Sequence, residues 1–98
     1  MTQEQSERQF EFIYTCEIQK INPGDNLEVS YSPQSQKYFL LDPEEYKQWF
    51  PTYSGIVISS NHTTLDEIIL QNPITNETYA CENKAGNESM IFIKRFLD

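Results

Sequence analysis

Hydrophobic and polar residues alternate along several parts of this chain, and a period of two is typical of a β-strand with one buried face. The first alternating segment covers residues 10–19, and the next covers residues 27–31. The apolar positions are Phe10, Phe12, Tyr14, Cys16 and Ile18, followed by Leu27, Val29 and Tyr31. We therefore expect a strand in each segment, with its apolar side buried.

Residues 22–25, with the sequence Asn-Pro-Gly-Asp, separate these segments. The proline fixes φ and the glycine accepts a positive φ, so the sequence predicts a tight turn. A hairpin centred on this turn would place Ile18 opposite Val29, so that apolar side chains meet on one face. The outer face of that hairpin would carry the acidic residues Glu11, Glu17 and Glu28.

The rest of the chain predicts more strands and a short helix. Asp42 and Pro43 would open the helix near residues 43–50, because an acidic N-cap followed by proline favours helix initiation. Residues 65–71 fit either a helix start or a strand, and the turn expected at 72–76 favours the strand. The other expected strands cover residues 36–41, 55–60, 77–82 and 89–96, with the last two paired as a hairpin.

These elements predict a mainly β protein, on the borderline of α+β. We expect a single-domain antiparallel sheet of about seven strands, barrel- or sandwich-like, with one short helix. Residues 1–8 are polar and are expected to form a flexible N-terminal arm, and residues 9–98 one globular domain. A chain of 98 residues, 13% of them aromatic, is long enough to bury such a core without a metal or a disulfide.

The charge of the chain limits the partners that it can attract. It carries 15 acidic and 7 basic residues, which give a net charge of −8. This charge repels phosphate backbones and acidic membrane surfaces, so we expect neither direct nucleic-acid binding nor membrane binding. A basic protein is the favoured partner, because opposite fields accelerate encounter. The alternative is that the excess of acids serves solubility alone.

Few residues have the spacing that catalysis or metal binding requires. The single histidine, His62, and the distant Cys16 and Cys81 do not match a zinc site, and no calcium-binding loop is present. Glu44 and Glu45 are adjacent carboxylates, but acids at a helix start are also favoured by the helix dipole. We therefore predict a non-enzymatic protein without a cofactor or metal. A weaker alternative is an enzyme whose site forms only across a subunit boundary.

The cysteines and the first residues of the chain indicate the cellular compartment of the protein. The first residues, Met-Thr-Gln-Glu-Gln-Ser-Glu-Arg, do not resemble a signal peptide, and no apolar run is long enough to span a bilayer. These features predict a cytoplasmic protein in which Cys16 and Cys81 are free thiols. Since both cysteines lie within apolar stripes, we expect them to pack in the core.

Residues 46–53 form the densest aromatic segment and include the only tryptophan, Trp49. Aromatic anchors inside a polar rim are typical of protein interfaces. The expected docking residues are Asp42, Glu44, Glu45, Tyr46, Trp49 and Tyr53, with Glu11, Glu17 and Glu28 on the first hairpin as a second candidate surface. The alternatives are that Trp49 and Phe50 fix the helix onto the sheet, and that the hairpin acids are only solvated.

Residues 77–86, with the sequence Glu-Thr-Tyr-Ala-Cys-Glu-Asn-Lys-Ala-Gly, resemble the F strand of an immunoglobulin-like domain. In that family a tyrosine two residues before the second cysteine forms a corner, and Tyr79 and Cys81 match this spacing. The resemblance implies an extracellular recognition module with a disulfide between Cys16 and Cys81. The chain departs from the family because no tryptophan follows Cys16 at the expected distance.

Taken together, the residues predict a small acidic protein that binds another, basic protein without catalysing a reaction. Small inhibitors, immunity proteins and adaptors share this general character. The immunoglobulin-like module is the alternative, and the state of the two cysteines distinguishes them.

Overall fold

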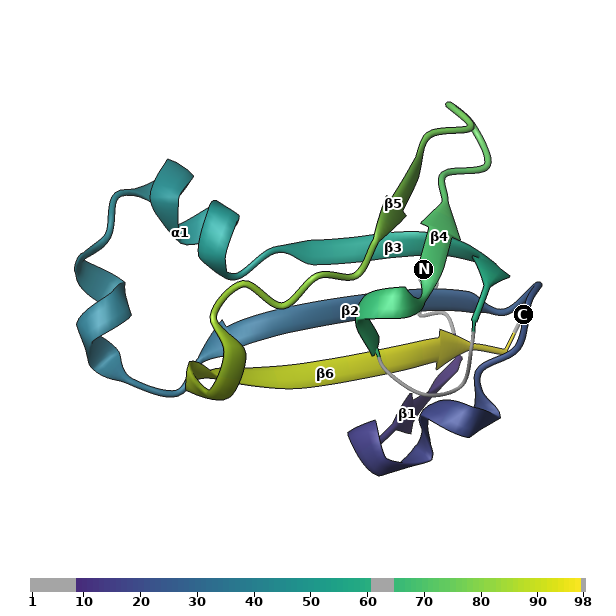
Figure 1. Cartoon of the computed structure of the whole chain (residues 1–98), viewed down its shortest axis with the longest axis horizontal. Helices are drawn as coiled ribbons and strands as arrows, with labels where there is room; N and C mark the ends of the chain where they lie inside the picture. Colours follow the sequence, from purple (N-terminus) through teal and green to yellow (C-terminus); the bar gives the residue numbers. More distant parts are fainter. Residues whose placement is uncertain (1–8, 61–64, 98) are drawn as a thin grey trace, which may run out of the picture.

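The computed structural model describes residues 9–60 and 65–97. Within these residues the chain forms one open antiparallel sheet with the strand order β1-β6-β2-β3-β4-β5 (Figure 1). The strands are β1 (Phe10–Ile13), β2 (Asn26–Pro33), β3 (Thr52–Ser59), β4 (Ile69–Gln71), β5 (Thr78–Ala80) and β6 (Ser89–Phe96). The prediction of a mainly β, single-domain antiparallel fold is confirmed. The described sheet has six strands and is open, where about seven strands in a closed or doubled sheet were expected.

Short helices occupy most of the connections between the strands. The α-helix of the described residues is α1 (Pro43–Trp49), which confirms the helix expected after Asp42. The 3-10 helices of the described residues are η1 (Thr15–Lys20), η2 (Gln36–Leu40), η3 (Leu65–Glu67) and η4 (Gly86–Glu88). The expected N-terminal arm, residues 1–8, and the expected turn at 61–64, which contains His62, lie outside the described residues.

The core lies on one face of the sheet. Val29 of β2 is in register with Ile93 of β6 and with Tyr53 of β3, so their side chains share that face. The face is covered by η1, η3 and the chain between β5 and β6. The buried side chains that these segments add are Ile18, Ile21, Leu65, Ile68 and Cys81.

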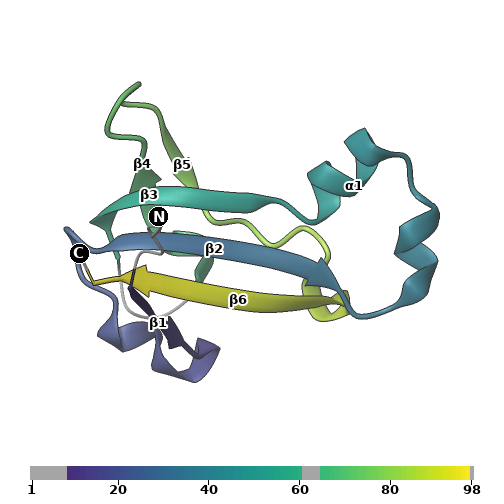
Figure 2. The same cartoon turned by 180° about the vertical axis from the view of Figure 1, so that it is seen from behind.

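The opposite face of the sheet is open. Figure 2 shows it from behind, and none of the described helices lies over β2, β3 and β6 there. Along β2 the residues alternate between buried and half-buried positions, as the sequence pattern predicts. Near β1 the open face carries exposed Phe12, Met90 and Phe92.

The predicted hairpin between residues 10–19 and 27–31 is wrong, although its turn is confirmed. The amide of Asp25 bonds to the carbonyl of Asn22 at 3.1 Å, and Gly24 has a φ of +97°. The neighbours of β2, however, are β3 and β6, and β1 pairs with β6. After Ile13 the chain leaves the sheet and forms η1 instead of a longer strand.

Local polar contacts explain why η1 replaces that strand. The carboxylate of Glu17 accepts a hydrogen bond from the amide of Tyr14 at 3.2 Å, which is the return bond of a capping box. Lys20 donates to the same carboxylate at 2.7 Å. These contacts join residues three apart, which lie side by side in a helical turn and on opposite faces of a strand.

Other expectations need correction. Residues 36–41 were expected to form a strand, but most of this segment is η2, whose first turn is capped by the Ser35 side chain. The predicted final hairpin is also wrong, because β5 pairs with β4 and β6 lies between β1 and β2. The ambiguous segment 65–71 contains both structures, since η3 is followed directly by β4. Strand β6 covers Ser89–Phe96, as predicted.

Candidate docking surfaces

The connection from β2 to β3 contains η2 and α1 and extends beyond the end of the sheet (Figure 1). We call residues 35–50 the η2–α1 arm. Asp42 joins the two helices, and its carboxylate accepts hydrogen bonds from the amides of Glu44 and Glu45, both at 3.0 Å. Pro43 follows at the first position of α1, where its missing N–H costs nothing. The sequence thus fixes the start of α1 locally.

Phe50 holds the arm against the body of the protein. Its side chain is 5% exposed, and its ring packs edge to face with Tyr38 at a centroid distance of 5.0 Å. The ring of Tyr46 lies at 5.3 Å from the same ring. Phe50 also belongs to the buried core of the protein, so it anchors the arm, whereas Trp49 is 43% exposed.

A charged contact joins the arm to η4. The Nζ atom of Lys37 lies 2.9 Å from Oε1 of Glu88. Hydrogen bonding to Lys37 and Tyr38 holds the pKa of the Glu88 carboxyl below its usual value. Hydrogen bonding to Glu88 raises the pKa of both Lys37 and the Tyr38 hydroxyl. The contact is exposed to solvent, so it orients the arm more than it stabilises the fold.

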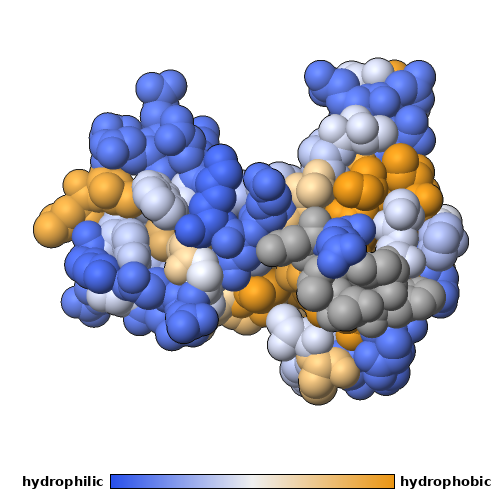
Figure 3. Space-filling view, viewed as in Figure 1, coloured by the Kyte–Doolittle hydropathy of each residue, from blue (hydrophilic) through white to orange (hydrophobic). Residues whose placement is uncertain are grey.

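Large apolar side chains are exposed on the arm. Phe39 is 63% exposed and Leu40 is 89% exposed, and both belong to η2. Figure 3 shows apolar surface at the outer end of the arm, surrounded by hydrophilic residues. The sequence pattern does not predict the exposure of these two residues, because a run of apolar residues is typical of a buried strand.

The carboxylates of the η2–α1 arm are not neutralised by ion pairs within the described part of the chain. Glu44 and Glu45 are exposed, and no ion pair joins either of them to a described cation. Hydrogen bonds from the amide and side chain of Glu45 and from the amide of Glu44 lower the pKa of Asp42. In return, the hydrogen bond to Asp42 and its negative charge raise the pKa of Glu45. The carboxyl groups of the arm therefore interact with one another, and a cationic partner would relieve their repulsion.

Tyr46 and Tyr53, which were expected to be docking residues, expose only part of their side chains. Both are half-buried and pack against the core. The ring of Tyr53 lies between those of Tyr31 and Tyr79, and its hydroxyl donates to the carbonyl of Glu82 at 3.3 Å. These tyrosines support the arm and the sheet, and Trp49 is the exposed aromatic residue of α1.

The acids assigned to the first hairpin do not form one face. Glu17 lies in η1, and Glu11 and Glu28 occupy different register positions beside β6. Each has a cation: Glu17 pairs with Lys20 at 2.7 Å, Glu11 with Arg95 at 3.2 Å and Glu28 with Lys94 at 3.8 Å. Hydrogen bonding to Lys20 lowers the pKa of Glu17. Internal pairing thus reduces the negative field of these carboxylates toward a partner.

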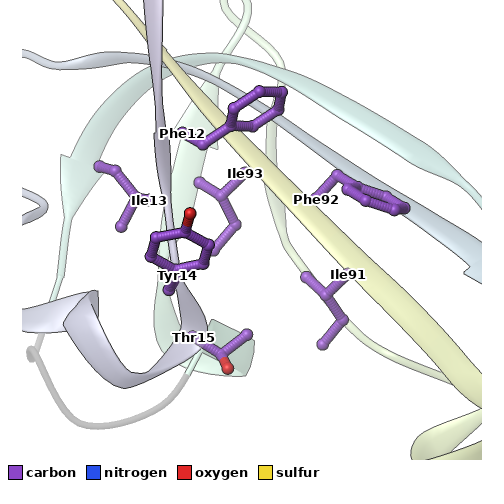
Figure 4. Close-up of a pocket in the computed structure, with 7 residues that line it drawn as sticks. All are labelled: Phe12, Ile13, Tyr14, Thr15, Ile91, Phe92 and Ile93. Atoms are coloured by element: carbon purple, nitrogen blue, oxygen red, sulfur yellow. The ribbon is translucent and has the colours of Figure 1, made fainter.

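A separate pocket of about 340 Å³ lies where β1 and β6 diverge (Figure 4). Tyr14 and Thr15 come from the chain that leaves β1, and Ile91 and Phe92 come from β6 (Figure 4). The lining residues are Phe12, Ile13, Tyr14, Thr15, Ile91, Phe92 and Ile93, none of which is charged. No sequence pattern predicts this pocket, because it depends on which strand lies beside β1.

The cysteines lie in different surroundings and are not joined by a disulfide. Cys81 is fully buried, as expected, and its amide bonds to the carbonyl of Ile68 at 3.3 Å. The expectation that Cys16 packs in the core is wrong, because Cys16 lies in η1 and is exposed. An immunoglobulin-like domain packs two sheets across a disulfide, whereas the described strands here form one sheet.

Within residues 9–60 and 65–97, no three His, Cys, Asp or Glu side chains gather as a metal site would require. Nor does any helix in this part of the chain have the length and apolar character needed to span a membrane. Comparison of the chain with protein-family models, curated proteins and solved structures gives no match.

Proposed function

We propose that this protein acts by binding another protein, of basic character, through the η2–α1 arm, and that it does so without catalysis. The observation that carries the proposal is that Phe39 and Leu40 of η2 are exposed on the same arm as the exposed carboxylates of Glu44 and Glu45 in α1. An inhibitor or adaptor would use such a surface.

The two parts of the surface supply different contributions to binding. Exposed apolar side chains gain free energy when a partner covers them, and aromatic residues such as Trp49 are common among the residues that dominate interfaces. The carboxylates and the net charge of −8 attract a basic protein and accelerate encounter. Because the arm is held at Phe50, its exposed side chains are presented without a large ordering cost.

The test compares arm variants with a control of equal charge. The full chain is immobilised at low salt, basic proteins captured from a native lysate are identified, and the affinity of a purified one is measured. Phe39→Ser/Leu40→Ser should weaken binding at least about tenfold. Glu44→Gln/Glu45→Gln should weaken it by about tenfold at low salt and by less at high salt.

Glu77→Gln/Glu82→Gln is the matched control, since it removes the same charge from exposed residues outside the arm. Binding by this control should remain within about twofold of that by the unmodified chain. Equal losses in both charge variants would mean that only the overall charge matters. A captured protein that binds the Phe39→Ser/Leu40→Ser variant undiminished would overturn the assignment of the arm.

A further inference from the structure

The ladder between β1 and β6 ends before β6 does. Its last pair is Ile13 with Ile93, whereas the ladder between β2 and β6 continues to Pro33 with Ser89. Residues 89–92 of β6 therefore have a described strand neighbour on the β2 side only. Within this segment the backbone of Ser89 is already bonded, because its amide donates to the Gly86 carbonyl and its carbonyl accepts from the Gln34 side chain, so the open part of the edge is centred on Ile91. Edges of this kind are templates for pairing with another extended chain.

The backbone of Ile91 points toward this open edge. The amide of Leu97 bonds to the carbonyl of Gln9, so the backbone groups of Leu97 face the β1 side. Backbone groups alternate in direction along a strand, and β6 keeps an unbroken register with β2. Ile91 is an even number of residues from Leu97, so its N–H and C=O are directed away from β2.

No residue of β1 pairs with Ile91. If the register of β1 continued past Ile13, Thr15 would lie opposite Ile91, but the chain turns into η1 at Thr15. The apolar pocket of about 340 Å³ occupies this place, between Thr15 and Ile91 (Figure 4). The site thus combines a strand edge with a hollow that accepts apolar side chains.

We propose that an extended segment of a partner protein adds as a strand to residues 89–92 of β6, in line with β1. Its backbone would pair with Ile91. Its apolar side chains would alternate between the isoleucines that line the pocket on the core face of the sheet and the exposed rings of Phe12 and Phe92, which line it on the open face. This mode is independent of the η2–α1 arm, which lies on the connection between β2 and β3.

Charge distinguishes the possible occupants. A second copy of this chain also carries −8, so the two copies repel each other at long range. The pocket lining is uncharged, so the residues that enter it should be apolar. A segment with alternating apolar residues and flanking Lys or Arg satisfies both conditions.

The test uses random displayed peptides of about ten residues, a usual strand length, selected on the full chain. The best binder is synthesised, and a second version is N-methylated on alternate backbone nitrogens so that it cannot pair as a strand. We expect apolar residues at every second position, basic flanks, protection of the Ile91 amide from hydrogen exchange, and at least about tenfold weaker binding after N-methylation.

Two variants locate the site on the protein. Thr15→Arg places a long charged side chain at the exposed border of the pocket and should weaken binding at least about tenfold, whereas Thr52→Arg, on an exposed position of β3, should change it by less than about twofold. Ile91→Pro removes the outward N–H without touching the ladder to β2 and should also abolish binding.

The opposite results overturn the proposal. One such result is that no selected peptide binds the Thr15→Arg variant more weakly than the unmodified chain. A second is that the N-methylated peptide binds with equal affinity. A third is that the selected peptides lose affinity for the Phe39→Ser/Leu40→Ser variant instead. Sedimentation showing a dimer that Thr15→Arg dissociates would assign the edge to a second copy, and would overturn the proposal as well.

Discussion

The rings of Tyr38 and Phe50 pack edge to face at a centroid distance of 5.0 Å, and this contact joins the start of the η2–α1 arm to its end. The arm leaves β2 and returns to β3, and between these points it lies outside the sheet (Figure 1). Because this contact closes the arm where it meets the sheet, the connection can expose Phe39 and Leu40 to solvent and still remain ordered. Edge-to-face pairs of this kind add about 0.5–1.5 kcal/mol to the burial of the rings.

Replacement of Phe50 should therefore release the arm. Phe50→Ala removes a side chain that is 5% exposed, and we expect the free energy of unfolding to fall by about 3–5 kcal/mol. The neighbouring Trp49→Ala, at 43% exposure, should cost about 1 kcal/mol or less. Urea unfolding of both variants measures the difference, and equal losses would contradict the anchoring role of Phe50.

Acid should loosen the contact between the arm and η4. Because Lys37 and Tyr38 lower the folded-state pKa of Glu88, the contribution of Glu88 to stability is complete above the ordinary glutamate pKa. It is lost as the pH falls through the lowered folded-state value. The amide signals of Lys37 and Tyr38 in NMR spectra should report this titration, and Glu88→Gln should remove it. Persistence of the titration in that variant would assign it to another group.

Alkali should loosen the same contact by the opposite route. Glu88 raises the pKa of the Tyr38 hydroxyl, so this contribution is present below the ordinary tyrosine pKa and is lost as the pH rises through the raised value. Absorbance of tyrosinate separates the titration of Tyr38 when Tyr38→Phe is measured beside the unmodified chain. Glu88→Gln should shift the Tyr38 titration to lower pH, and an unchanged midpoint would contradict the contact.

Local chemistry explains which elements the sequence predicts correctly. Asp42 caps α1 through bonds to the next residues, and residues 22–25 make their turn with Pro and Gly in the required positions. Strand β2 has a buried face that the alternating sequence pattern predicts. In all these elements the deciding contacts are close in the sequence, or the pattern extends over most of the strand.

Strand order and exposure of apolar residues are decided by distant contacts. Residues 14–20 alternate as a strand would, but β6 takes the place beside β2, and Glu17 stabilises η1 instead. Phe39 and Leu40 belong to an apolar run that normally predicts burial, yet both are exposed in η2. The pocket at Ile91 exists only because β1 is short and its partner comes last in the chain. The Trp49 and Glu44–Glu45 part of the candidate site was therefore predictable, and the rest was not.

Arg95 should prove more important to the fold than its neighbour Lys94. Its guanidinium donates to the Lys20 carbonyl at 2.6 Å, to Asp25 at 3.2 Å and to Glu11 at 3.2 Å, so it joins β6, β1 and the turn before β2. Arg95→Met should lower the free energy of unfolding by about 1–3 kcal/mol, because it leaves polar groups without their partner. Hydrogen exchange should then accelerate in β1 before it does in β3.

Lys94→Met is the control for this substitution. Lys94 lies 3.8 Å from Glu28 and above the ring of Phe10, and its side chain is partly exposed to solvent. Its loss should cost at most about 1 kcal/mol. If both variants lose the same stability, or if Arg95→Lys is as stable as the unmodified chain, the multiple contacts of the guanidinium contribute nothing specific.

The two thiols should react at very different rates. Cys16 is exposed in η1, whereas Cys81 is fully buried, so N-ethylmaleimide should modify Cys16 in the folded protein and both cysteines only in denaturant. Intact-mass measurement counts the added groups without reductant, and Cys16→Ser should leave the folded protein unmodified. Modification only after reduction would instead indicate a Cys16–Cys81 disulfide, as an immunoglobulin-like module requires. Rapid modification of both thiols in the folded state would mean that the chain between β5 and β6 opens readily, because only opening exposes Cys81.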